Sequence, residues 1–301
     1  MRIQTILALT DFSAAAERAV ERAALLAVTH QARLELMHVA ERGAVRPRHL
    51  DDRLHQRARQ LSRRHALAVQ AQGGDGDAAS AIRASQRADL LVMDARTHGR
   101  WRWPTRATGL QAQVLRASAC PVLVVQSDPR SAYRHALVHA TSDVDGELLR
   151  GMRRLHAAQT VELFHVAQPE GGLRLACSEA FTRALQRRRR SAQPQQPRVR
   201  VSDAFEARRN RVGMATGRLD AARQLAVQQQ STGADLLVLA HDRRSVLRDL
   251  LQAGKAWRLL AGSASVRCDL LLVPQPPARA AEPLRGSADQ SAVARRWTQA
   301  T

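Results

Sequence analysis

Short apolar runs recur along the chain, separated by longer stretches in which apolar residues have helical spacing. Ala88-Asp-Leu-Leu-Val-Met93 returns as Ala234-Asp-Leu-Leu-Val-Leu239, and three further runs also return, in the same order. The runs of the first half cover residues 6–9, 34–40, 88–93 and 120–125, and their counterparts cover 136–139, 161–167, 234–239 and 268–273. Such runs, often β-branched, are typical of strands buried on both faces of a parallel sheet. Their repeated order predicts a tandem duplication.

The stretches between these runs predict helices. In the first half they cover residues 14–29, 77–87 and 110–118, and in the second half 148–158, 218–230 and 255–262. Ser13 is a suitable N-cap for the first of them, with Glu17 close behind it. Strands that alternate with helices indicate right-handed βαβ units and an open parallel sheet covered on both sides. We therefore expect an α/β protein with two doubly wound open parallel-sheet domains in tandem.

The repeat boundaries divide the chain into a domain at residues 1–127, a second domain at 134–274 and a flexible C-terminal tail at 275–301. Pro129 lies in the short linker between the domains. Two further segments are interpreted as insertions. Residues 41–64 are strongly basic, and 49–64 are expected to form an exposed polar helix. Arg187–Arg190 precede a Pro/Gln-rich loop and are interpreted as a solvated helix end.

The chain is strongly basic, with a formal net charge of +20 over 301 residues. Lys255 is its only lysine, so the arginine excess is explained either by a genome rich in G and C or by function. At low salt this charge attracts nucleic acid without sequence preference. No run is long and apolar enough to span a membrane, and the uncharged run before Asp11 is too short for a signal peptide. We expect a cytoplasmic protein without membrane association.

Five motifs resemble those of the universal stress protein (UspA-like) family, in its tandem two-domain form. They are Ile6-Leu-Ala-Leu-Thr-Asp-Phe-Ser13, Met37-His-Val39, Ala88-Asp-Leu-Leu-Val-Met93, Thr97-His-Gly-Arg100 and Cys120-Pro-Val-Leu-Val-Val125. The resemblance covers roughly residues 3–126 well and 134–274 more loosely. It implies the adenine-nucleotide alpha-hydrolase-like fold and a role in the response to stress. Many members of this family bind ATP.

The family's ATP signature is partly present in the first half. It consists of a glycine, two residues, a second glycine, nine residues, then a glycine followed by Ser or Thr. Gly99 and Gly109 have the required spacing, whereas Arg96 replaces the first glycine and Leu110 the closing hydroxyl residue. Glycines let backbone N–H groups approach phosphates at a helix N-terminus. ATP is thus an expected ligand of a partly degenerate site.

The resemblance also implies further contacts for this nucleotide. Asp11 has the place of the aspartate that contacts it, and Thr10, Val39 and His98 complete the implied site. Asp94 stands where family members commonly have a glycine.

In the second half the signature positions hold other residues. They are Ala240, Arg243, Ala253 and Gly254, and Thr141 replaces the aspartate. Nucleotide binding is therefore not expected there.

Other residues that suggest chemistry have simpler explanations. The Arg/Trp-rich loop at 100–106 can stack bases, hold phosphates in place of the lost glycines, or cover a surface. His38 and His165 are repeat equivalents beside strands, and no histidine spacing fits a metal site. Cys120 and Cys268 precede the last strand of each half and are expected to be buried and inert. No catalytic residues are assigned, although weak ATPase activity stays an alternative.

These observations predict a stress-response protein that acts as a binding or regulatory module rather than as an enzyme. The two halves are expected to pair through residues 122–125 and 270–273 as an intramolecular pseudodimer, and the whole chain can form a homodimer. Protein partners stay unidentified. The alternatives are an ATP sensor that uses the first domain and an arginine-rich protein associated with nucleic acid.

Overall fold

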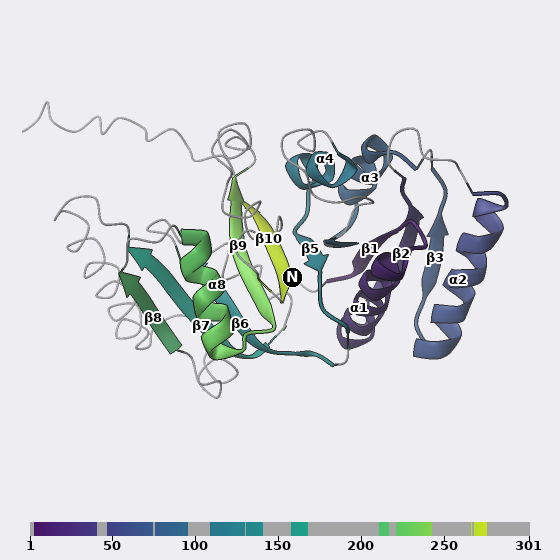
Figure 1. Ribbon diagram of the computed structural model, residues 1–301. Coiled ribbons are helices and arrows are strands. Elements are labelled where there is room, and N and C mark those ends of the chain that lie inside the picture. The colour runs from purple at the N-terminus through teal and green to yellow at the C-terminus, as the bar shows by residue number, and fades with distance from the viewer. Residues whose placement is uncertain are drawn as a thin grey trace, which may run out of the picture.

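The computed structural model describes residues 3–40, 47–74, 76–95, 109–129, 131–140, 158–167, 211–216, 221–242, 266 and 268–275 (Figure 1). The described strands form one ten-stranded sheet in the order β3-β2-β1-β4-β5-β10-β9-β6-β7-β8. All neighbouring strands are parallel except β5 and β10, which pair antiparallel in the middle. The predicted α/β class with doubly wound parallel sheets is confirmed.

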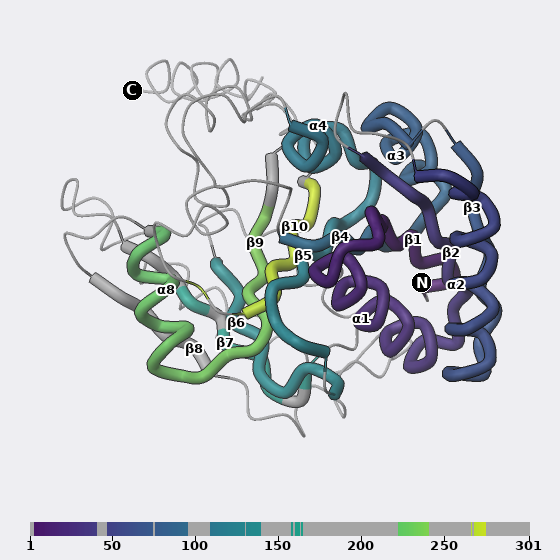
Figure 2. The backbone as a smooth tube through the Cα atoms, turned by 45° about the vertical axis from the view of Figure 1, so that its right-hand side comes forward, coloured from purple at the N-terminus to yellow at the C-terminus, as the bar shows by residue number. Residues whose placement is uncertain are grey.

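The first half supplies five strands and four described helices. The strands are β1 (Thr5–Thr10), β2 (Arg33–His38), β3 (Val69–Gln72), β4 (Leu90–Asp94) and β5 (Val122–Val125). The helices are α1 (Ala14–His30), α2 (Leu50–His65), α3 (Ala78–Ser85) and α4 (Leu110–Ala117). In the tube view α1 and α2 lie near each other along this part of the sheet (Figure 2).

The second half supplies the other five strands and one described helix. The strands are β6 (Tyr133–Ala140), β7 (Ala158–Ala167), β8 (Arg211–Thr216), β9 (Leu236–Asp242) and β10 (Asp269–Gln275), and the helix is α8 (Ala221–Thr232). The order of these strands outward from the centre, β10-β9-β6-β7-β8, matches the order β5-β4-β1-β2-β3 of the first half.

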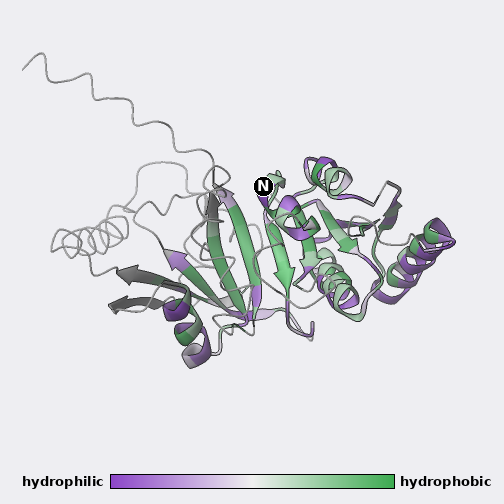
Figure 3. Ribbon diagram, turned by 45° about the horizontal axis from the view of Figure 1, so that its top comes forward, coloured by the Kyte–Doolittle hydropathy of each residue, from purple (hydrophilic) through white to green (hydrophobic). Residues whose placement is uncertain are grey.

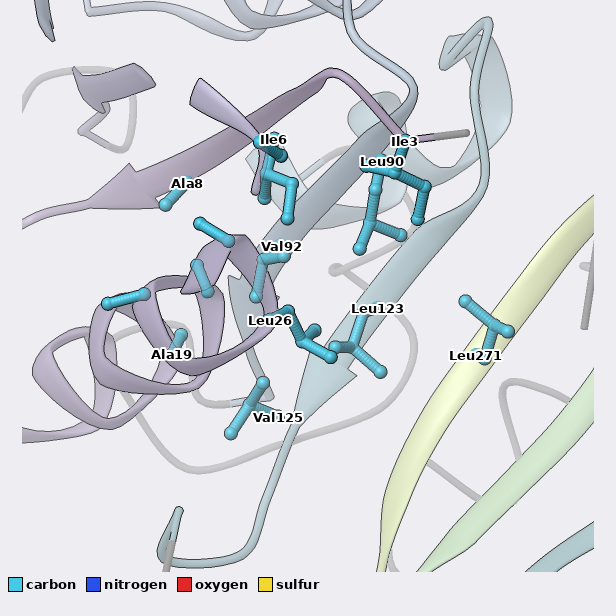
Figure 4. Close-up of a cluster of buried hydrophobic side chains, with 14 of the residues drawn as sticks. Ile3, Ile6, Ala8, Ala19, Leu26, Leu90, Val92, Leu123, Val125 and Leu271 are labelled. Carbon is cyan, nitrogen blue, oxygen red and sulfur yellow. The ribbon is translucent and has the colours of Figure 1, made fainter. Parts of the chain in front are cut away.

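Two layers of apolar side chains cover the two faces of the sheet, and the central strands are accordingly hydrophobic on both sides (Figure 3). On one face, α1 packs over side chains such as Ile6, Val92 and Leu123 (Figure 4), and α2 packs beside it over β2 and β3. Leu271 of β10 belongs to the same cluster, so this core continues from one half into the other. On the opposite face, α3, α4 and α8 cover the alternate residues, for example Leu91.

Local sequence explains where two of the helices begin. The Ser13 side chain accepts a hydrogen bond from the Ala16 N–H at 3.2 Å, which confirms the predicted N-cap of α1. The Asp77 side chain accepts one from the Ser80 N–H at 2.8 Å and caps α3. The hydrogen bond from Ser80 holds the pKa of Asp77 below its usual value. Both caps satisfy amide groups that otherwise have no partner inside a helix.

Helix α2 corrects the interpretation of residues 41–64 as an insertion. It is the crossover helix between β2 and β3, so it is a regular part of the fold. Nor is the helix simply exposed, because Leu50, Leu54, Ala58 and Leu61 are buried at helical spacing. The many arginines on its other faces hid this narrow apolar stripe in the sequence.

Two boundaries also need correction. Ala158 begins β7 and so does not belong to the helix predicted over residues 148–158. The last strand continues through Pro274 to Gln275, so the tail predicted from 275 begins later. The remainder of that tail, the rest of the 148–158 helix, the helix at 255–262 and Arg187–Arg190 lie outside the described residues. The division into domains at 127 and 134 stays a prediction.

Candidate functional site

The carboxyl ends of β1 and β4 are neighbours in the first half of the sheet. β1 and β4 are neighbours, but the chain continues from β1 to β2 on one side and from β4 to β5 on the other, so the two connections lead in opposite directions. In open α/β sheets such a switch point leaves a crevice at the carboxyl ends of the strands. Thr10 ends β1, Asp94 ends β4 and Val39 follows β2. Three sequence-selected residues therefore lie at this edge.

A tight turn holds Asp11 at the edge. Phe12 has a left-handed backbone with φ 62°, which is unusual for a residue other than glycine. The buried Thr10 hydroxyl accepts the Phe12 N–H at 3.0 Å, and Asp11 Oδ1 accepts the Ser13 N–H at 2.8 Å. These two bonds and the Ser13 cap fix the direction of the chain between β1 and α1. Asp11 is thus held at a defined place without being fully buried.

Val39 lies directly beside this turn. Its backbone N–H donates to the Thr10 carbonyl oxygen at 2.9 Å, and its side chain is buried in the core under α3 and α4. The structure therefore brings Thr10, Asp11 and Val39 together at this edge. Their role in nucleotide binding stays a prediction.

Gly109 occupies the N-cap position of α4 and has no side chain to cap it. The Gln111 side chain donates to the carbonyl oxygen of Asp94, so the first turn of α4 is attached to the end of β4. Because β4 neighbours β1, the helix N-terminus belongs to the same edge as Asp11. The helix dipole places partial positive charge there, which favours a phosphate.

An aromatic stack that the sequence did not reveal adjoins the Asp11 turn. The rings of Phe12 and His38 are stacked with centroids 5.6 Å apart. The Arg53 guanidinium lies 4.5 Å from the centroid of the Phe12 ring. Gly76, with φ 74°, approaches His38 so closely that a side chain would crowd its ring. Phe12 could have been suspected as a neighbour of Asp11, but Arg53 is brought here only by the packing of α2.

The remaining predicted site residues cannot be placed. Arg96, His98, Gly99 and the Arg/Trp-rich loop at 100–106 lie outside the described residues. In the second half, Ala240 lies in β9, whereas Thr141, Arg243, Ala253 and Gly254 also lie outside the described ranges. What the sequence implied about nucleotide binding by these residues stays a prediction.

Cys120 and Cys268 are buried, as expected. Burial raises the pKa of the Cys120 thiol to about 11, and burial, followed by the charge of Asp269, also raises the pKa of the Cys268 thiol. Neither thiol is therefore activated as a nucleophile near neutral pH. Within the ranges that the structure covers, no three His, Cys, Asp or Glu side chains gather as a metal site. Among the same residues, no helix is long and apolar enough to cross a membrane.

Comparison with known proteins identifies the domain that carries this edge. Residues 2–126 match the universal stress protein family. The first half is a universal stress protein domain. A search of curated proteins gave no significant match.

Solved structures of universal stress proteins extend the likeness in fold beyond this domain. A universal stress protein from Archaeoglobus fulgidus DSM 4304 superposes with a TM-score of 0.64 at 12% identity, covering 91% of this chain and 97% of its own. A functionally unknown protein from Pseudomonas aeruginosa PAO1 gives 0.61 at 18% identity, with 90% and 92% covered. A putative universal stress protein from Pseudomonas aeruginosa UCBPP-PA14 gives 0.61 at 17%, with 90% and 93% covered. At these identities the likeness shows the fold.

Proposed function

We propose that this chain is a cytoplasmic stress-response protein that acts as a binding or regulatory module, and that its first domain binds an adenine nucleotide at the carboxyl edge of β1 and β4. The observation that carries the proposal is that one edge holds Asp11, Val39 and the N-terminus of α4. Asp11 offers hydrogen-bond acceptors for ribose hydroxyls, and Val39 lies beside the turn, where its backbone N–H is bonded to Thr10 and its side chain is buried. The N-terminus of α4 favours the phosphates.

The site is a reduced form of the family's ATP site, and this sets the expected affinity. Gly109 is in the place that the signature requires, at the start of a helix, but Leu110 replaces the closing hydroxyl residue. Asp94 adds negative charge at the end of β4, close to where phosphates would lie. We therefore expect micromolar binding of one nucleotide per chain, and we propose binding rather than turnover.

Titration calorimetry with ATP and Mg²⁺ tests the proposal, at about 0.3 M salt to screen the excess positive charge. Asp11→Asn removes the charge of the site carboxylate and keeps an oxygen that can accept the Ser13 N–H. Asp89→Asn is the matched control, because Asp89 also accepts backbone N–H groups, from Gln4 and Thr5, but at the opposite edge of the sheet. We expect Asp11→Asn to weaken ATP binding at least about tenfold, as a charge-assisted hydrogen bond warrants, and Asp89→Asn to leave it unchanged.

Two outcomes would contradict the proposal. An absence of heat and of any thermal shift with ATP would show that the edge is not a nucleotide site, and the domain would then act as a scaffold. Equal weakening by both substitutions would show that the binding depends on overall charge rather than on the Asp11 turn.

A further inference from the structure

A buried polar network lies where β5 and β10 meet. Arg22 of α1 is 5% exposed and Asp269 of β10 is fully buried, and Arg22 Nε lies 3.2 Å from Asp269 Oδ2. The Tyr133 hydroxyl donates to the same carboxylate oxygen at 2.6 Å. The Arg22 guanidinium also lies 4.3 Å from the centroid of the Tyr133 ring and donates through Nη1 to the Ser131 carbonyl at 2.6 Å.

The second oxygen of Asp269 holds the chain as it leaves β5. Asp269 Oδ1 accepts the N–H groups of Gln126 and Ser127, both at 2.9 Å, and the Ser127 hydroxyl at 2.7 Å. The Gln126 side chain in turn donates to the Cys268 carbonyl at 3.1 Å. A fully buried carboxylate is tolerated only with such complete pairing. Asp269 therefore joins α1, the end of β5 and the start of β6 to β10.

The two strands that meet here are repeat equivalents, but the network is asymmetric. Leu123 faces Leu271, and these two residues occupy the same position in the repeat that aligns Cys120 with Cys268. In the same alignment the equivalent of Asp269 is Pro121. Proline has no side-chain acceptor, so the strand of the first half lacks the group on which the network depends.

We propose that β5 pairs selectively with β10, the last strand of the second half, and not with β5 of another copy. The Asp269 carboxylate determines this selectivity. In a β5–β5 pair with the same register, Pro121 of the second copy would stand where Asp269 stands. Arg22 would then be buried without a carboxylate, and the N–H groups of Gln126 and Ser127 would lose their acceptor. Removing one member of a buried ion pair is strongly destabilising, whereas the native pairing gives Arg22 its carboxylate and gives both N–H groups their acceptor.

Hydrogen exchange of the full-length protein, followed by mass spectrometry, tests this selectivity. Asp269→Leu keeps the backbone N–H of residue 269, which donates to the Asp235 carbonyl, and removes only the carboxylate. We expect the amides of residues 122–127 to exchange at least about a hundredfold faster, while those of β1 and β2 change little. The double variant Arg22→Leu with Asp269→Leu is expected to recover at least tenfold of this protection, because no unpaired guanidinium is left.

The dependence on protein concentration separates partner selection from simple stabilisation. In Asp269→Leu, another copy's β5 should be rejected, so the exchange of residues 122–127 should stay fast between about 1 and 100 µM protein. A return of protection with a doubled molar mass would show that β5 accepts a second copy, and would overturn the proposal. Unchanged exchange in Asp269→Leu, or no recovery in the double variant, would overturn it as well.

Discussion

Some residues of the candidate nucleotide site at the carboxyl edge could be predicted from the sequence, and others could not. Thr10, Asp11 and Val39 were predicted because the motifs at residues 6–13 and 37–39 resemble those of the universal stress protein family. Arg53 was not found, because its place beside Phe12 depends on how α2 packs. The position of a side chain on a neighbouring helix cannot be predicted from the spacing of the strand motifs.

The charge of Asp94 is expected to weaken nucleotide binding. Asp94 ends β4 beside the first turn of α4, where its charge opposes a phosphate. A unit charge at about 4 Å contributes about 1 kcal/mol even in water, so Asp94→Asn should tighten ATP binding about fivefold. Titration calorimetry under the conditions used for Asp11→Asn measures this. The same substitution with ADP and AMP shows whether the gain depends on the outer phosphates, and a loss of affinity would mean that Asp94 contacts the nucleotide favourably.

The strands that belong to the sequence repeat were predicted, whereas β3 and β8, the first and last strands in the order of the sheet, were not. β1, β4, β5 and their counterparts are nearly continuous apolar runs, since both of their faces are covered. β3 reads Val-Gln-Ala-Gln and is only partly buried, so its pattern does not differ from that of a loop. Helix α2 was predicted as a helix, but its buried face was missed among its charges.

The buried stripe of α2 can be tested by truncation. Leu61 is fully buried against the sheet, whereas Arg59 on the same helix is exposed. Leu61→Ala should lower the free energy of unfolding by about 2–5 kcal/mol, and Arg59→Ala should change it by less than about 0.5 kcal/mol. Urea denaturation followed by circular dichroism gives both values. Equal, small effects would restore the interpretation of α2 as a solvent-exposed helix.

The repeated apolar runs predicted the sheet of the whole chain, but they did not predict the contacts that hold β5 and β10 together at its centre. The order of the strands follows from two copies of one βαβ pattern. Asp269 looked like an ordinary polar residue at the start of an apolar run, and Arg22 like one arginine among many. Only the meeting of α1, β5 and β10 shows that both are buried partners.

Tyr133 reports on this central network, and it is the only tyrosine in the chain. Burial, and after it the charge of Asp269, raises the pKa of Tyr133 well above its usual value near 10. As the pH rises through about 10, the unfolded chain therefore loses a proton that the native protein retains, and stability falls. Absorbance at 295 nm should show no tyrosinate at pH 10.5 in the native protein and ionisation near pH 10 in urea. Native ionisation near pH 10 would mean that the network opens to water.

The antiparallel pairing of β5 with β10 also determines the directions in which the carboxyl ends of the strands point. Because the strands within each half are parallel, those of the first half end at one rim of the sheet and those of the second half at the opposite rim. The carboxyl edges of the two halves therefore face in opposite directions. A ligand at the Asp11 turn would therefore not contact the carboxyl ends of β9 and β6, so a change in sequence at one of these edges can leave the other unaffected.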